Sequence, residues 1–364
     1  MQTRRLLSRL GSRLHRKRDQ ELARLRAELA QARAAGHLQS FSGRNRSVFF
    51  ILGRGRSGTT WLRSILNSHP EILCWGEGRF FERSFEREDF EQWELKNIPP
   101  SSLYGAISGS KYLKAWVDRS VWARGRDTDT HLVNLTRLAV DYFLAEQLSK
   151  TDKRIVGDKT PFVSAEVVEE ISVVYPEAKV IHIIRDGRDV AVSMIHHMWN
   201  YSKDAGGFYD LEPEDLERRD AYRRNPASAL TEGLFTKNRL KGIARGWGAQ
   251  VGKAAEYGPA LLGDNYAEVR YEDLLERPAG ELGRLLGFLG ADASEETVRR
   301  CIEAGSFEKW SRGRRTGEEE SSSFYRKGVA GDWKNVFTEE DKRVFKAAAG
   351  DTLIELGYEA DNDW

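Results

Sequence analysis

The 364-residue chain is poor in cysteine and has no long apolar run. Its two cysteines, Cys74 and Cys301, are fewer than a secreted protein of this size usually carries, so we expect a reducing, cytoplasmic location and no disulfide. No apolar stretch approaches the roughly 20 residues that a membrane-spanning helix needs. Cysteine and histidine do not cluster at metal-ligand spacing, and we therefore expect no metal site.

Charge is distributed unevenly along the chain. The net charge is +1, but residues 1–46 hold twelve Lys or Arg against three Asp or Glu, a net charge of +9. Leu7, Leu10 and Leu14 have helical spacing, and the phase slips before Leu22, which argues against a sustained coiled coil. We expect a basic helical extension over residues 1–46 and one domain over residues 47–364. The extension is a short oligomerisation helix, a weak attachment to an anionic membrane surface, or a solvated segment with no specific partner.

Apolar segments typical of strands alternate with helical patterns in the rest of the chain. Strands are expected at residues 48–52, 71–75, 154–159, 179–186 and 266–273, and helices at 58–68, 136–149, 165–174, 189–199 and 240–256. This alternation predicts a single α/β domain of the P-loop type, with a mostly parallel central sheet flanked by helices. Ligands of such sheets bind beyond the carboxyl ends of the strands. Residues 200–233 show no periodicity and are expected to form a lid or substrate loop.

The segment SVFFILGRGRSGTTW, residues 47–61, indicates a buried strand, a glycine-rich turn and the start of a helix. Gly53 and Gly58 bracket four residues, the spacing of a loop whose backbone N–H groups and helix N-terminus face an anion. Nucleotide triphosphatases place a lysine directly after the second glycine, where this chain has Thr59. The cations lie inside the loop instead, as Arg54 and Arg56. The loop therefore predicts a phosphate-like ligand and chemistry other than ATP or GTP hydrolysis.

Two later segments also suit phosphate groups. In VIHIIRDGRDVAVS an apolar strand ends at Arg185, and Ser193 follows eight positions later near the start of a helix. An arginine fork and a serine hydroxyl at a sheet edge can hold one phosphate. In FYRKGVAGDWKNVFT, Arg326, Lys327 and Gly328 supply two cations and a flexible backbone for a second phosphate.

These three segments, taken in order, resemble the sulfotransferases that use 3′-phosphoadenosine 5′-phosphosulfate (PAPS). The resemblance covers about residues 47 to 338. It implies that Arg54, Arg56, Ser57, Gly58, Thr59 and Thr60 bind the 5′-phosphosulfate of PAPS. It also implies that the 3′-phosphate is bound by Arg185, Ser193, Arg326, Lys327 and Gly328. The positions that line the adenine in the family match Trp61, Tyr271 and Phe307.

The catalytic base departs from the cytosolic branch of that family. That branch has a Lys-Thr-His element, whereas this chain has Lys159 followed by Thr160 and Pro161. The stretch CWGEGRFF, residues 74–81, resembles the tyrosylprotein branch, in which a glutamate is the base. Glu77 is therefore our candidate base, with Asp158, His196 and His197 as alternatives. Arg56 and Lys159 are assigned to the charge that develops on the bridging oxygen.

The resemblance implies metal-independent, in-line transfer of a sulfuryl group from PAPS to a hydroxyl or amine. The acceptor stays open among small molecules, glycans, lipids and peptides; a nucleic-acid partner is not expected, and the oligomeric state is open. The residues expected to shape the acceptor pocket, which suit a hydrophobic core equally well, are His196, His197, Trp199, Tyr201 and Trp247. The competing classes are a P-loop kinase or nucleotide hydrolase, which needs Mg²⁺, and a non-catalytic nucleotide-binding protein.

Overall fold

Five parallel strands form the centre of the protein. The computed structural model describes residues 20, 23–24, 47–81, 102–160, 163–229, 233–320, 323 and 326–364, so the predicted extension over 1–46 lies almost wholly outside the described residues. The strands are β1 (Ser47–Leu52), β2 (Ile72–Gly76), β3 (Ile155–Thr160), β4 (Lys179–Ile184) and β5 (Tyr266–Arg270). They pair in the order β2-β3-β1-β4-β5. The predicted α/β class with a parallel central sheet is confirmed.

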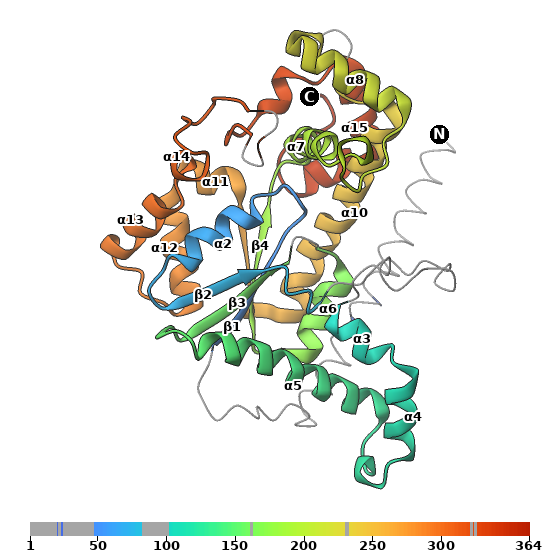
Figure 1. Cartoon of the computed structure of the whole chain (residues 1–364), viewed down its shortest axis with the longest axis vertical. Coiled ribbons are helices and arrows are strands. Elements are labelled where there is room, and N and C mark those ends of the chain that lie inside the picture. Colours follow the sequence, from blue (N-terminus) through green and yellow to red (C-terminus); the bar gives the residue numbers. More distant parts are fainter. Residues whose placement is uncertain are drawn as a thin grey trace.

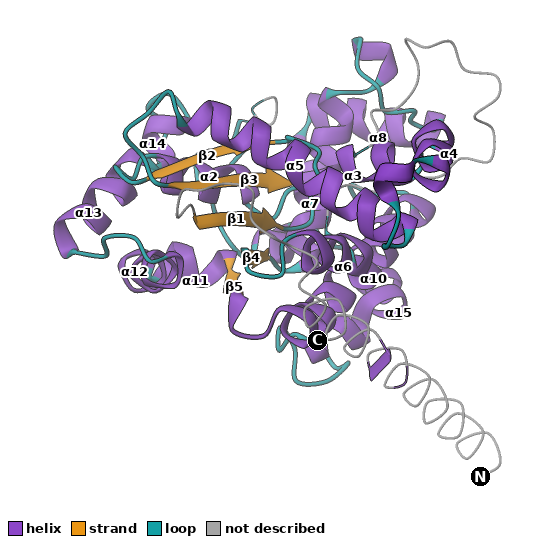
Figure 2. Ribbon diagram, turned by 90° about the horizontal axis from the view of Figure 1, so that it is seen from below, coloured by secondary structure: helices purple, strands orange, loops and turns teal. Residues whose placement is uncertain are grey.

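Helices connect the strands and cover both faces of the sheet (Figures 1 and 2). The first helices along the chain are α2 (Thr59–Asn67), α3 (Leu103–Ser108), α4 (Lys111–Arg119), α5 (Thr128–Leu148), α6 (Ala165–Val174), α7 (Gly187–Asn200) and α8 (Pro213–Arg224). The later ones are α10 (Lys237–Leu262), α11 (Tyr271–Glu276), α12 (Pro278–Leu289), α13 (Glu295–Ala304), α14 (Phe307–Trp310) and α15 (Glu339–Glu355). Short 3-10 turns are η3 (Val121–Ala123), η4 (Lys203–Ala205), η5 (Pro226–Ser228), η6 (Gly263–Asn265) and η7 (Asp332–Asn335).

The apolar strands are buried on both sides because successive side chains point to opposite faces. In β1, Phe49 and Ile51 pack with α2, α11, α12 and α13. Phe50 and Leu52 pack on the other face, in a larger cluster with α5, α6, α7, α10 and α15. All four side chains are almost completely buried. The sheet is therefore fixed between two hydrophobic layers, and its carboxyl edge has a fixed position.

Several side chains predicted to be functional reach that carboxyl edge. Glu77 directly follows β2, and Arg185 directly follows β4. Lys159 was expected just past its strand, but β3 continues through Thr160, so Lys159 lies within the strand. Parallel strands end at one edge of a sheet, and the loops after β1, β2 and β4 therefore meet there.

Two predicted segments differ from the structure. The strand expected over 266–273 ends at Arg270, and the helix α11 begins with Tyr271. The stretch 200–233 was expected to be a loop, but it contains α8. The buried positions of α8 include Asp215 and Arg219, so its inward face is partly charged and has no apolar periodicity. Asp215 is satisfied by Arg239 at 2.6 Å on α10, which explains how a charged helix face can pack inward.

Three expectations from the sequence concern the state of the cysteines, a metal site and a membrane-spanning helix, and each can be compared with the described part of the chain. Cys74 and Cys301 are both buried free thiols. The described residues form no cluster of His, Cys, Asp and Glu that could hold a metal ion. Within the same residues, every helix is too short or too polar to pass through a bilayer.

The packing of Phe49 on Gly157 generates a stability prediction. The two residues are register partners on β1 and β3, and a Cβ at position 157 would lie 2.4 Å from the Phe49 ring. Gly157→Ala should therefore destabilise the protein by about 1–3 kcal/mol through overpacking. Chemical denaturation measures this as a lower unfolding midpoint.

Gly283→Ala is the matched control. Gly283 lies inside α12, where a Cβ meets nothing within 4 Å. Alanine favours helices over glycine by about 1 kcal/mol, so this variant should unfold at the wild-type midpoint or above it. An unchanged midpoint for Gly157→Ala would contradict the packing that the structure shows.

Candidate active site

The loop between β1 and α2 lines a large cavity of about 1530 Å³ at the carboxyl edge of the sheet. Gly58 has φ of 91° and caps α2 without a side-chain hydrogen bond to the first turn. Thr59 and Thr60, the first two helical residues, line the cavity. The buried hydroxyl of Ser57 has no hydrogen-bond partner among the described residues. A helix N-terminus and an unsatisfied hydroxyl in one loop suit an anion.

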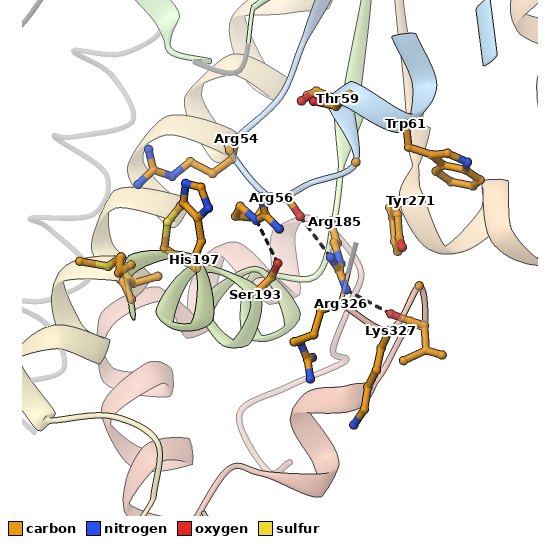
Figure 3. Close-up of a pocket in the computed structure, with 18 of the residues that line it drawn as sticks. Arg54, Arg56, Thr59, Trp61, Arg185, Ser193, His197, Tyr271, Arg326 and Lys327 are labelled. Carbon is orange, nitrogen blue, oxygen red and sulfur yellow. Dashed lines mark hydrogen bonds between the residues drawn. The ribbon is translucent and has the colours of Figure 1, made fainter. Parts of the chain in front are cut away.

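Two arginines concentrate positive charge at this loop (Figure 3). Arg56 Nε donates to Ser193 Oγ at 3.1 Å. Arg185 donates to the backbone oxygens of Arg56 and Val329, both at 3.1 Å. The buried Nε of Arg185 has no hydrogen-bond partner in the part of the chain that is described. Burial and the neighbouring Arg185 lower the pKa of Arg56 to about 10. Arg185 has a carboxylate beside it, because its Nη2 lies 3.8 Å from Asp189 Oδ2.

The cations of the third segment lie on the same cavity but have acidic partners. Arg326 and Lys327 both line the cavity and both form ion pairs with Asp332 and Glu319. Burial raises the pKa of each carboxyl, but the two cations outweigh it, and the pKa of Glu319 and that of Asp332 fall to about 2. The two carboxylates therefore hold Arg326 and Lys327 in position at neutral pH.

Aromatic side chains form the opposite end of the cavity from Arg54 (Figure 3). The rings of Trp61 and Tyr271 pack edge to face, with centroids 5.5 Å apart. Trp61 Nε1 donates to the backbone oxygen of Gly305 at 2.7 Å, which fixes the indole. Gly328 has φ of 67°, and a Cβ there would lie 2.5 Å from the Phe307 ring. These rings offer a flat aromatic base a stacking surface.

Glu77 and Lys159 form an ion pair on the same cavity. Lys159 Nζ donates to Glu77 Oε1 at 2.7 Å, and the Glu77 backbone N–H donates to the Lys159 oxygen at 2.7 Å. The ammonium is buried, whereas the carboxylate side chain is 57% exposed. The hydrogen bond from Lys159 lowers the pKa of Glu77 below its usual range. Glu77 also has φ of 65°, an unfavourable backbone conformation for a residue with a side chain.

The alternative bases differ in their access to the cavity. Asp158 is buried, accepts hydrogen bonds from Gly78 N and Thr160 Oγ1, and does not line the cavity; burial raises its pKa to about 6. His196 packs between Trp199 and Tyr222, away from the cavity. His197 lines the cavity, and burial together with Arg56 lowers its pKa to about 4. A neutral imidazole is therefore present beside Arg56 at pH 7.

A family model described as "Sulfotransferase domain" matches residues 46–357 of this chain. The chain belongs to the sulfotransferase family. It is 29% identical to Sulfotransferase 2B1 of Homo sapiens over 181 residues, which are 47% of this chain and 43% of that protein. It is 27% identical to Sulfotransferase 1A1 of Bos taurus over 180 residues, which are 47% of this chain and 53% of that protein. The chain thus spans about half the length of the curated relatives it matches.

Solved sulfotransferase structures are also similar to this one. The mouse sulfotransferase SULT7A1 complexed with PAP gives a TM-score of 0.48 at 17% identity, covering 87% of this chain and 88% of that one. The sulfotransferase from Alicyclobacillus acidocaldarius gives a TM-score of 0.45 at 14% identity, covering 86% and 96%.

The structure brings most of the predicted donor-site residues of the chain to the cavity, although Ser57 does not line it. Those that line it are Arg54, Arg56, Gly58, Thr59, Thr60, Trp61, Glu77, Lys159, Arg185, Ser193, His197, Tyr271, Phe307, Arg326, Lys327 and Gly328. Arg54 lies apart from Arg56: its Nη1 donates to Gln250 at 2.8 Å, and it lies with His197 on the side away from Trp61 (Figure 3).

Four residues predicted for the acceptor pocket do not line the cavity: His196, Trp199, Tyr201 and Trp247. Trp247 is fully buried below Gly187 and donates to the backbone oxygen of Arg185 at 3.2 Å, so it supports the site from beneath. The sequence reasoning missed several residues that line this end of the cavity, among them Met194, Met198, Phe208, Tyr209 and Ile243. Met194 and Met198 are four residues apart on α7 and therefore share one face of the helix, which was the available signal.

The arginine cluster predicts that the protein binds inorganic pyrophosphate. Arg185→Gln should weaken pyrophosphate binding about tenfold or more, because a hydrogen bond to a charged group contributes about 1.5–3 kcal/mol. Isothermal titration calorimetry measures the effect. Arg299→Gln, an exposed arginine on α13, is the charge-matched control and should bind as the wild type does. Equal pyrophosphate affinities of Arg185→Gln and Arg299→Gln would show that Arg185 does not bind the anion.

Proposed function

We propose that this sulfotransferase transfers a sulfuryl group from PAPS to a hydroxyl or amine of its acceptor. The observation that carries this proposal is the pair of cationic regions on one cavity. The loop after β1 supplies the Arg56 guanidinium and the N-terminus of α2, and Arg326 and Lys327 form a second cationic region. A nucleotide with phosphate groups at both its 5′ and 3′ positions matches two such regions, whereas AMP matches one.

The predicted donor residues divide between the two ends of the nucleotide. Ser57, Gly58, Thr59, Thr60 and Arg56 hold the 5′-phosphosulfate in this proposal. Arg185, Ser193, Arg326, Lys327 and Gly328 hold the 3′-phosphate, and Trp61, Tyr271 and Phe307 surround the adenine. The unsatisfied Arg185 Nε supports this assignment because it is a buried donor on a residue that lines the cavity, whereas the residue that carries the unsatisfied hydroxyl, Ser57, does not line it.

Transfer needs one bond to form and one to break. The acceptor oxygen or nitrogen bonds to sulfur, the sulfur–oxygen bond to the phosphate breaks, and the leaving phosphate keeps the electron pair. Arg56 and Lys159 stabilise the negative charge on the leaving oxygen, and Glu77 takes the acceptor proton. The ion pair of Lys159 with Glu77 links stabilisation of the leaving group to removal of the acceptor proton. Negative charge that develops beside Lys159 during transfer attracts its ammonium group away from Glu77. The hydrogen bond from Lys159 to Glu77 then weakens, which raises the pKa of Glu77 and makes it a better base.

The acceptor end of the cavity is mixed in character. Met194, Met198, Phe208 and Ile243 give it an apolar wall, and Arg54 and Glu212 add charges of both signs. We propose an acceptor that has an apolar body and a reacting hydroxyl or amine. A cytoplasmic location, the absence of a resident metal and the division at residue 46 stay predictions.

Nucleotide binding tests the proposal. The metal-free protein should bind 3′-phosphoadenosine 5′-phosphate at least about tenfold more tightly than AMP, because the 3′-phosphate gains charge-assisted hydrogen bonds. Arg326→Ala should reduce this preference, since it removes one cation and leaves Glu319 and Asp332 facing the phosphate. Calorimetry in EDTA measures both affinities.

The control for this experiment is Arg343→Ala, which removes an exposed arginine on α15. It should leave the preference unchanged. Equal affinity of the wild type for the two nucleotides would overturn the 3′-phosphate assignment. A requirement for Mg²⁺, with hydrolysis of ATP, would favour the kinase or hydrolase class instead.

The base is tested by Glu77→Gln and His197→Gln. Loss of general-base catalysis should lower kcat of Glu77→Gln about 10²-fold or more while donor affinity stays near wild type. His197→Gln should keep most of kcat. Turnover of ³⁵S-labelled PAPS with a panel of acceptors measures both variants. The pH profile does not separate these two candidates, because the hydrogen bond from Lys159 lowers the pKa of Glu77 and burial lowers that of His197 to about 4. Near-normal kcat in Glu77→Gln together with a large loss in His197→Gln would transfer the role to His197.

A further inference from the structure

The helix α4 and the turn η3 expose three large aromatic side chains. Tyr112 is 92% exposed, Trp116 is 60% exposed and Trp122 is 90% exposed. Exposed aromatics of this size are unusual in such number on one short segment, because each leaves a large apolar area in water. Residues 111–126 are called the aromatic hairpin below.

The aromatic hairpin presents one face outward. Tyr112 and Trp116 are four residues apart and therefore lie one turn apart on α4. Val117 is buried on the other side of the same helix, which holds α4 against the protein. The helix projects from the body of the molecule beside α3 and the start of α5, away from the sheet and the cavity (Figure 1). The exposed rings are thus held at a protruding point of the fold.

Positive charge surrounds these rings. The aromatic hairpin carries Lys111, Lys114, Arg119, Arg124 and Arg126, all exposed, and a single acidic residue, Asp118. Its net charge is therefore +4. The Asp118 carboxylate accepts a hydrogen bond from the Thr128 hydroxyl. Within the described part of the chain, none of the five cations forms an ion pair.

We propose that the aromatic hairpin docks on the surface of a lipid bilayer that contains anionic lipids. Trp and Tyr favour the interface between water and acyl chains, because the ring is apolar and its N–H or O–H is polar. Lys and Arg reach the lipid phosphates through long side chains whose apolar stems lie along the interface. The exposed rings match the interface between water and acyl chains, and the cations match the lipid phosphates above it.

A protein partner explains the exposed aromatic side chains but not the lysines beside them. Protein interfaces favour Trp, Tyr and Arg but contain few lysines in their cores, and here Lys111 and Lys114 flank Tyr112. The five exposed cations of the aromatic hairpin also require a strongly acidic partner. A bilayer with anionic headgroups supplies that charge continuously. The basic stretch 1–46, with a net charge of +9, would add to the attraction.

Vesicle co-sedimentation of the full-length protein tests this proposal. Vesicles of phosphatidylcholine with about a third phosphatidylserine should bind the protein, and pure phosphatidylcholine vesicles should bind it at least tenfold less. Trp116→Ala with Trp122→Ala should weaken binding to the anionic vesicles about tenfold or more. Lys111→Gln with Lys114→Gln should weaken it about tenfold to thirtyfold, and high salt should weaken the wild type.

Matched controls separate the aromatic hairpin from the rest of the surface. Tyr142→Ala with Phe143→Ala removes exposed aromatics from α5 outside the hairpin. Lys253→Gln with Arg299→Gln removes exposed cations from α10 and α13. Both double variants should bind vesicles as the wild type does. Thermal unfolding checks that every variant is folded, and the lysine pair provides a second test if the tryptophan pair is unstable.

Three results would overturn the proposal. The first is unchanged vesicle binding in both hairpin variants, which would assign any membrane contact to residues 1–46. The second is equal binding to neutral and anionic vesicles. The third is a wild-type protein that ignores vesicles but forms a dimer lost in the hairpin variants, which would make this face a contact between two copies of the chain.

Discussion

Arg185 connects three parts of the chain that are distant in sequence. It directly follows β4, it donates to the backbone of Arg56 in the loop after β1, and it donates to the backbone of Val329 near the C-terminal cations. Its guanidinium also lies over the Tyr271 ring, 4.3 Å from the centroid. The loop, the aromatic end of the cavity and the second cationic region therefore keep their relative positions through one side chain. A ligand that contacts two of these parts therefore meets them at a spacing that Arg185 fixes.

This arrangement places Arg56 close to Arg185, whose guanidinium lies 3.8 Å from the Asp189 carboxylate. Burial, and after it the neighbouring Arg185, depress the pKa of Arg56. In contrast, Arg326 and Lys327 are balanced by Glu319 and Asp332. The loop that carries Arg56 is suited to the reacting end of a donor, where negative charge develops during transfer. The balanced region is suited to a group that is bound but does not react, because its cations keep their positions throughout the reaction.

Core packing decides which aromatic and titratable residues take part in the site. Trp247 and His197 both lie near Arg185 or Arg56, yet Trp247 is covered by Gly187 whereas His197 opens onto the cavity. The neighbouring His196 turns into a cluster with Trp199 and Tyr222. Adjacent residues of α7 point about 100° apart, so one faces the core and the next faces the cavity.

The sequence by itself determined the parallel α/β fold, because apolar strands that alternate with helices allow few other arrangements. It also identified the glycine-rich loop and both cationic segments that the fold brings to one cavity, since glycine spacing and strand-end arginines are local patterns. It did not predict α8, whose inward face is charged and is neutralised by Arg239 on a distant helix. It did not show that His196 packs in the core while His197 lines the cavity, or which tryptophans lie in the core and which line the site. The pairing of Glu77 with Lys159 and of Arg326 with Asp332 was also decided by the tertiary structure. These contacts, and the pKa values that follow from them, depend on distances across the fold that no local sequence pattern records.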